Sequence, residues 1–125
     1  MSSRMGMSVD AVIPSSLLSK ALDFITDGAV QGIRAGICMD GIVELDGNGE
    51  YIVVLELSDE PIDPVGMCIA SDEGGVEPSV DDLMLFHDEV GDHGILIVSD
   101  PFACEFAAHL VDGDAVRRAE ILLTE

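Results

Sequence analysis

The spacing of hydrophobic and polar residues predicts two amphipathic helices. Ser15 or Ser16 is a suitable N-cap for a first helix that ends near Thr26. Ser79 is a suitable N-cap for a second helix that ends around Gly91. The apolar positions at helical spacing are Leu17, Leu18, Ala21, Leu22 and Ile25 in the first helix and Val80, Leu83, Met84 and Phe86 in the second.

Short β-type runs occupy most of the remaining chain. Residues 42–45 and 51–57 flank Asp46-Gly47-Asn48-Gly49, and they predict a β-hairpin because glycine and asparagine tolerate the positive φ of a tight turn. Further strands are predicted at 9–13, 33–39, 65–70 and 95–98. The last of these is continuously apolar, which is typical of a central strand.

The pattern in the final third of the chain is compatible with either strands or helices. Residues 103–111 alternate as a strand does, but Asp100-Pro101 before them could also begin a helix, and 115–123 present the same choice. A weak internal repeat at a shift of about 65 residues favours strands. In this repeat Pro14-Ser15 corresponds to Pro78-Ser79, and Leu45-Asp46-Gly47 corresponds to Val111-Asp112-Gly113.

The prediction is therefore one α+β domain with a pseudo-two-fold duplication. A flexible lead at 1–8 precedes a domain at 9–125, whose halves span about 9–62 and 63–125. Each half has the order β-α-β-β-β. The two helices are expected side by side on one face of mostly antiparallel strands, with the hairpin and residues 103–123 in equivalent positions.

The surface charge is extreme. Twenty-five acidic residues stand against five basic ones, for a formal net charge of −20, while 48% of the residues are hydrophobic. That hydrophobic share indicates a packed core rather than a disordered acidic tail. Molar salt, where the Debye length is about 3 Å, would relieve the repulsion. The balance is typical of a halophile or its virus; the alternatives are an acidic mimic that binds a basic partner and an acidic mesophilic surface.

Cysteine usage and hydropathy indicate a cytoplasmic or virion protein. Cys38, Cys68 and Cys104 form no CxxC pair and have apolar neighbours, so free buried thiols in a reducing compartment are expected. Residues 1–7 lack the apolar stretch of a signal peptide, and no apolar run approaches the roughly 18 residues of a membrane span. No membrane contact is predicted.

No catalytic motif is present in the sequence. His87 and His93 have acidic residues between them, which suggests a metal site, but a zincin places its two histidines one helical turn apart. Exposed polar histidines are the preferred interpretation. Nucleophile-elbow and phosphate-loop patterns are also absent. We therefore predict a non-enzymatic protein with no catalytic, cofactor or metal site.

The element order resembles a single domain of the archaeal and eukaryotic DNA sliding clamp over most of residues 9–125. The segments that carry the resemblance are Ser16 to Phe24, Met39 to Ile42, Val53 to Leu57, Asp81 to Leu83, Asp92 to Ser99 and Val111 to Arg118. It implies a clamp-like binding or assembly domain, replication-associated, with Lys20 and Arg34 as candidates to face DNA or another anion. The net charge disfavours nucleic acid, so a protein partner or self-assembly is expected.

Two alternatives belong to other functional classes. One is a virion or other structural component that assembles through strand edges, with Arg117, Arg118 and Ile121 at the candidate edge. The other is an acidic inhibitor or nucleic-acid mimic.

A second resemblance concerns the end of the central strand. Ser99-Asp100-Pro101 is similar to the His-Ser-His-Pro segment of the JAB/MPN metal-dependent isopeptidases. Val98 and Asp100 stand where that family places zinc-binding histidines. Without those histidines no water can be activated, so this resemblance implies an inactive relative.

Overall fold

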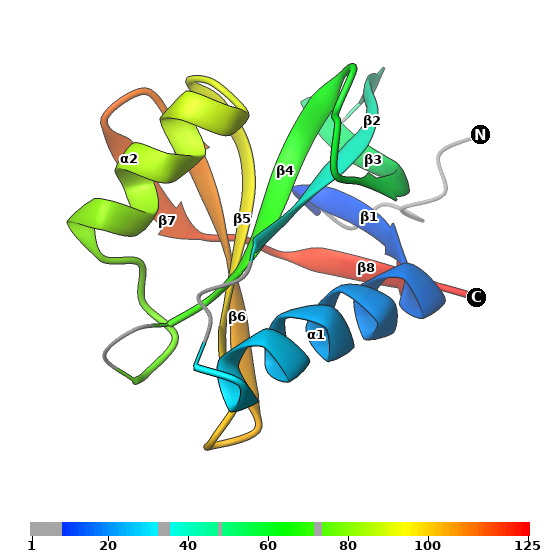
Figure 1. Ribbon diagram of the computed structural model, residues 1–125. Coiled ribbons are helices and arrows are strands. Elements are labelled where there is room, and N and C mark those ends of the chain that lie inside the picture. Colours follow the sequence, from blue (N-terminus) through cyan, green and yellow to red (C-terminus); the bar gives the residue numbers. More distant parts are fainter. Residues whose placement is uncertain (1–8, 33–35, 48, 72–73) are drawn as a thin grey trace.

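The structure, a computed structural model, describes residues 9–32, 36–47, 49–71 and 74–125. Within these residues the chain forms two helices and eight strands (Figure 1). In chain order they are β1 (Ala11–Pro14), α1 (Ser15–Val30), β2 (Gly36–Asp46), β3 (Gly49–Ser58), β4 (Pro64–Ala70), α2 (Val80–Glu89), β5 (His93–Asp100), β6 (Glu105–Asp112), β7 (Ala115–Arg118) and β8 (Ile121–Thr124).

The strands form one mixed sheet in the order β7-β6-β5-β4-β2-β3-β1-β8. Pairs β2–β3, β2–β4, β5–β6 and β6–β7 are antiparallel, while β1–β3, β1–β8 and β4–β5 are parallel. The unit β4-α2-β5 joins two neighbouring parallel strands through a helix, as a βαβ crossover does.

The sheet curls strongly, and its connectivity requires it to do so. Strands β7 and β8 stand at opposite ends of the sheet, and only Ala119 and Glu120 separate them in the chain. In a flat sheet seven strand spacings would hold these strands about 34 Å apart, whereas three Cα steps reach about 11 Å. The curl is held by Arg117, whose guanidinium donates to both carboxylate oxygens of Asp10 at 2.9 and 2.7 Å.

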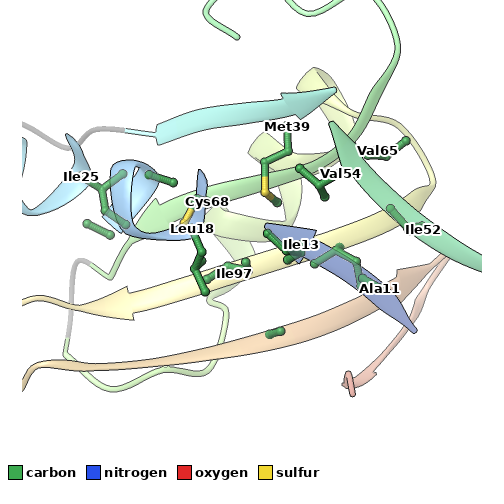
Figure 2. Packing of buried hydrophobic residues seen from close by; sticks show 14 residues of the cluster. Ala11, Ile13, Leu18, Ile25, Met39, Ile52, Val54, Val65, Cys68 and Ile97 are labelled. Carbon is green, nitrogen blue, oxygen red and sulfur yellow. The ribbon is translucent and has the colours of Figure 1, made fainter. Parts of the chain in front are cut away.

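The two helices cover opposite faces of the central strands. Residues of α1 pack into the core cluster shown in Figure 2, which takes Cys68 from β4 and Ile97 from β5. Phe86 of α2 packs into a second cluster with the alternate residues of β5, Leu96 and Val98. Successive strand residues point to opposite faces, so the clusters lie on either side of the sheet. Burial on both faces explains the continuous apolar run at 95–98.

Both predicted helices are present, with different ends. The Ser79 hydroxyl accepts from the Asp82 N–H at 3.1 Å, and the Asp82 carboxylate accepts from the Ser79 N–H at 2.9 Å, which completes a capping box on α2. Helix α1 has Pro14 at its N-cap and no side-chain cap. It continues past the predicted end near Thr26 to Val30, and Ala29 in this last turn still packs against the core.

The predicted hairpin is confirmed as β2 and β3, and the mixed α+β class is confirmed as well. The strands predicted separately at 33–39 and 42–45 form one continuous strand, β2. Residues 33–35 and Asn48 of the turn lie outside the described residues. Residues 115–123 are extended as predicted, but they form two short strands at opposite ends of the sheet rather than one.

The duplication is not confirmed. Helix α1 connects β1 to β2, which are not neighbours, whereas α2 connects the neighbours β4 and β5. The helices also lie on opposite faces, so the expectation of two helices side by side on one face is wrong. Burial on both faces of β4 and β5 requires a cover on each side, and a one-sided arrangement would have left one cluster exposed.

Candidate functional site

The most structured polar region lies at the carboxyl ends of the parallel strands β4 and β5. In α/β units, loops at this end and the following helix N-terminus commonly form binding sites. Here the loop at 74–79 leads into α2 and borders an open cleft of about 630 Å³. The cleft is lined by Ser71, Gly74, Glu77, Pro78, Ser79, Val80, Asp81 and Asp82.

Asp100 links this loop to the β5–β6 turn. Its carboxylate accepts hydrogen bonds from the backbone N–H groups of Gly75 at 2.8 Å and of Phe102 and Ala103 at 3.2 Å each. These bonds, that from Gly75 foremost, hold the pKa of Asp100 below its ordinary value. The carboxylate is therefore ionised at neutral pH and already occupied by three donors.

The two residues before Asp100 face the interior. Val98 is fully buried beside Phe86 in the second core cluster. Ser99 is buried too, with its hydroxyl oxygen 3.5 Å from the Glu105 carbonyl oxygen, and its own carbonyl accepts from the Ser71 N–H at 2.8 Å. Both residues therefore serve the packing and backbone pairing of β5.

A buried histidine fixes the other side of the loop. His109 of β6 is 1% exposed, and its Nε2 lies 2.7 Å from the Val76 carbonyl oxygen. Because a carbonyl only accepts, Nε2 carries the proton and donates. The Nδ1 atom lies 3.9 Å from Glu77 Oε2, too far for a hydrogen bond, and Glu77 Oε1 accepts from Arg118 Nε at 3.0 Å. This hydrogen bond to Arg118 lowers the pKa of Glu77.

The residues at the end of β5 do not fit a zinc ion. Val98 offers an aliphatic side chain with no donor atom, and the Asp100 oxygens already accept three backbone hydrogen bonds. Across the described ranges, no three His, Cys, Asp or Glu side chains gather in a way that could hold a metal.

The two histidines of the metal alternative have separate surroundings. His87 Nδ1 lies 3.1 Å from the Gly91 carbonyl oxygen and 3.3 Å from Asp92. His93 Nδ1 lies 3.8 Å from Asp112. The prediction that no metal binds stays a prediction.

The other residues singled out in the sequence are dispersed. Lys20 is exposed on α1, and Arg34 lies outside the described residues. Arg117 and Arg118 are paired with acids, as described above, and Ile121 aligns with Ala11 in the parallel pair β1–β8. Strands β7 and β8 are the two edge strands of the described sheet. Assembly through these edges stays a prediction.

Sequence reasoning missed the polar links that organise the site. The alternation of 103–111 grouped His109 with Glu105 and Ala107 on the face opposite the apolar one, whereas the structure buries His109. Its partner Val76 is 33 residues away on a loop, and local pattern carries no signal for such a pairing.

Neither helix in the described part of the chain is long and apolar enough to cross a membrane.

By sequence, no known protein family and no curated protein matches this chain. Solved structures do match. One is described as "JAMM: A Metalloprotease-like Zinc Site in the Proteasome and Signalosome", with a TM-score of 0.63, 17% identity, and coverage of 94% of this chain and 100% of that one. Another is a structural-genomics protein from Desulfitobacterium hafniense, with a TM-score of 0.55, 15% identity, and coverage of 92% and 93%.

At these identities the likeness shows the fold, and the fold is JAMM-like. The resemblance to a sliding clamp is therefore wrong, and so is the clamp-like function drawn from it. The strand-edge structural component and the acidic mimic do not account for this fold either. The error has a physical source: the element order was predicted largely correctly, but the order does not specify which strands pair or which face each helix covers.

Proposed function

We propose that this chain is a catalytically inactive JAMM-fold domain that acts by binding a protein partner rather than by chemistry. The observation that carries the proposal is the end of β5. One structural neighbour is described as having a metalloprotease-like zinc site. In this chain the two positions that the isopeptidase resemblance assigns to zinc-binding histidines hold Val98 and Asp100.

Neither residue supports metal-assisted hydrolysis. Such chemistry needs a zinc ion with protein ligands and one open position for an activated water. Val98 contributes to the core, and a zinc ion at Asp100 would have to displace backbone donors from Gly75, Phe102 and Ala103. Those N–H groups would then need other acceptors.

The same region instead holds the N-terminal end of α2 in place. Asp100 attaches Gly75 to the β5–β6 turn, and His109 attaches Val76 to β6. The Ser71 N–H is bonded to the Ser99 carbonyl. The loop at 74–79 is therefore tied at several points to the sheet, which favours a rigid scaffold over a mobile catalytic loop.

The experiment measures zinc content and hydrolysis together. Protein incubated with excess zinc in molar potassium chloride is passed through gel filtration, and its metal is quantified by mass spectrometry. A fluorogenic isopeptide-linked substrate is assayed in parallel. We expect far less than one equivalent of zinc and no hydrolysis above the buffer rate.

The control variant is Asp100→Asn, which keeps the side-chain shape and removes the carboxylate. One equivalent of zinc in the unmodified chain, lost in Asp100→Asn and accompanied by hydrolysis, would contradict the proposal. One equivalent lost in His87→Ala instead would place a metal at the end of α2 and refute the predicted absence of a metal site.

A further inference from the structure

Three large apolar side chains are exposed together on the β2–β3 hairpin and the loop that follows it. Ile42 is 44% exposed, Leu55 is 57% exposed and Ile62 is 84% exposed. They line an open groove of about 330 Å³, here called the hairpin groove. Its remaining lining residues are Asp40, Gly41, Glu56 and Asp63. A contiguous apolar surface of this kind commonly marks a binding site.

A buried carboxylate holds the groove in shape. Asp40 is 6% exposed, and its two carboxylate oxygens accept from the N–H groups of Ile62 at 3.3 Å and Asp63 at 3.2 Å. The Gly41 N–H donates to the Asp63 carbonyl at 3.2 Å. The loop that carries Ile62 is thus attached to β2, and its exposed side chain is held beside the hairpin.

The strand geometry under the groove also requires a specific residue. The pairing register of β2 shifts between Asp40 and Gly41 against β3 and between Met39 and Asp40 against β4. A Cβ on Gly41 would lie 2.0 Å from the Val53 carbonyl oxygen and 3.0 Å from Val65 Cγ2. Only glycine permits this close approach of the two strands.

The chain segment that forms the groove is acidic, and three of its acidic residues, Asp40, Glu56 and Asp63, line the groove itself. Residues 36–70 contain no lysine, arginine or histidine. They contain eight acidic residues: Asp40, Glu44, Asp46, Glu50, Glu56, Asp59, Glu60 and Asp63. A second copy docked groove to groove would bring two such segments together, and like-charge repulsion opposes this contact. A basic partner would be attracted by the same charges.

We propose that the hairpin groove binds a basic segment of another protein. Apolar side chains of that segment pack on Ile42, Leu55 and Ile62, while its lysines or arginines face Glu56 and Asp63 at the groove wall. The inference gives the proposed partner-binding role a location and a partner chemistry. It does not depend on whether the end of β5 binds zinc.

The probe is a pair of fluorescein-labelled synthetic peptides of equal length and equal lysine content. One carries leucines between its lysines, and the other carries serines at the same positions. Binding is measured by fluorescence anisotropy for the unmodified chain, for Ile62→Ser, and for Val30→Ser as the matched control. Val30 is 70% exposed at the end of α1 and lies outside the hairpin groove, so it controls for loss of any exposed apolar side chain.

We expect the leucine peptide to bind at least tenfold more tightly than the serine peptide. Ile62→Ser should weaken leucine-peptide binding at least tenfold, whereas Val30→Ser should change it less than twofold. Binding should also weaken as salt is raised. Circular dichroism verifies folding of both variants, whose mutated side chains are largely exposed.

Three results would overturn the proposal. Equal affinity for both peptides would show attraction by charge alone. Equal weakening by Ile62→Ser and Val30→Ser would show that the groove has no special role. A concentration-dependent dimer in sedimentation, dissociated by Ile62→Ser, would identify a second copy as the occupant. Since zinc content is measured separately, failure here is distinct from failure of the inactive-enzyme proposal.

Discussion

Phe86→Ala tests most directly how α2 is attached to the sheet. Phe86 is fully buried and is packed among β4 and β5 residues in the second core cluster. Truncating such a phenylalanine costs about 3–5 kcal/mol, because burial is lost and a cavity remains. For a chain of this length the entropy of unfolding is roughly 0.26 kcal/mol/K, so a loss of about 4 kcal/mol lowers Tm by about 15 °C.

The assay is urea unfolding followed by circular dichroism in molar potassium chloride, with calorimetry for Tm. Met84→Ala is the control, since Met84 is exposed on the same helix and its truncation should change the free energy of unfolding by less than about 0.5 kcal/mol. A loss below 1 kcal/mol for Phe86→Ala would refute the packing of α2 described here.

A double-mutant cycle tests the placement of the two helices on opposite faces. Ile25→Val on α1 should cost about 0.5–1.5 kcal/mol. Ile25 and Phe86 belong to separate core clusters, so their effects should add within about 0.5 kcal/mol. Coupling well above 1 kcal/mol would mean that the helices share one core, as in the arrangement first expected from the repeat.

Three further outcomes are expected. Tm should climb steadily from low salt to molar potassium chloride if the charge of −20 reflects halophilic adaptation, and a salt-independent Tm would remove that interpretation. Hydrogen bonds lower the pKa of folded Asp100, so its stabilisation is present above its unfolded pKa and is lost as pH falls through the folded value. Asp100→Asn should therefore destabilise at pH 7 in urea titrations, with a difference that shrinks towards about pH 3; a constant difference would contradict the assignment. The expectation of buried thiols holds for Cys38 and Cys68 and is wrong for Cys104, which is exposed. Burial raises the pKa of Cys68 to about 12 and also raises that of Cys38, so a thiol reagent at pH 8 should label Cys104 fast and the other two only on unfolding. Equal labelling rates would contradict the described burial.

Local chemistry was enough to predict several elements from the sequence. Ser79 and Asp82 cap α2 through bonds that span three residues. The β2–β3 hairpin follows from turn residues between two apolar runs. The apolar run at 95–98 correctly indicated a strand covered on both faces. Each of these features depends on neighbours in the chain, which a sequence displays directly.

The candidate site was only partly predictable for the same reason. The sequence singled out Val98 and Asp100 as replacements for zinc-binding histidines, and that comparison needed no structure. It could not show that the Asp100 carboxylate accepts a hydrogen bond from the N–H of Gly75, which is 25 residues away. Nor could it show that Asp40 holds Ile62 above the hairpin.

The sequence by itself determined the two helices, the β2–β3 hairpin and the central strand β5, because hydrophobic periodicity records whether a face meets water or protein. Only the tertiary structure decided what each buried face meets. Residues 115–123 read as extended, and the two residues Ala119 and Glu120 then carry the chain from one end of the sheet to the other. That crossing is set by the curl of eight strands and by the Asp10–Arg117 pair, whose members are 107 residues apart. Periodicity carries no information about partners so distant, and the fold was misassigned at that point.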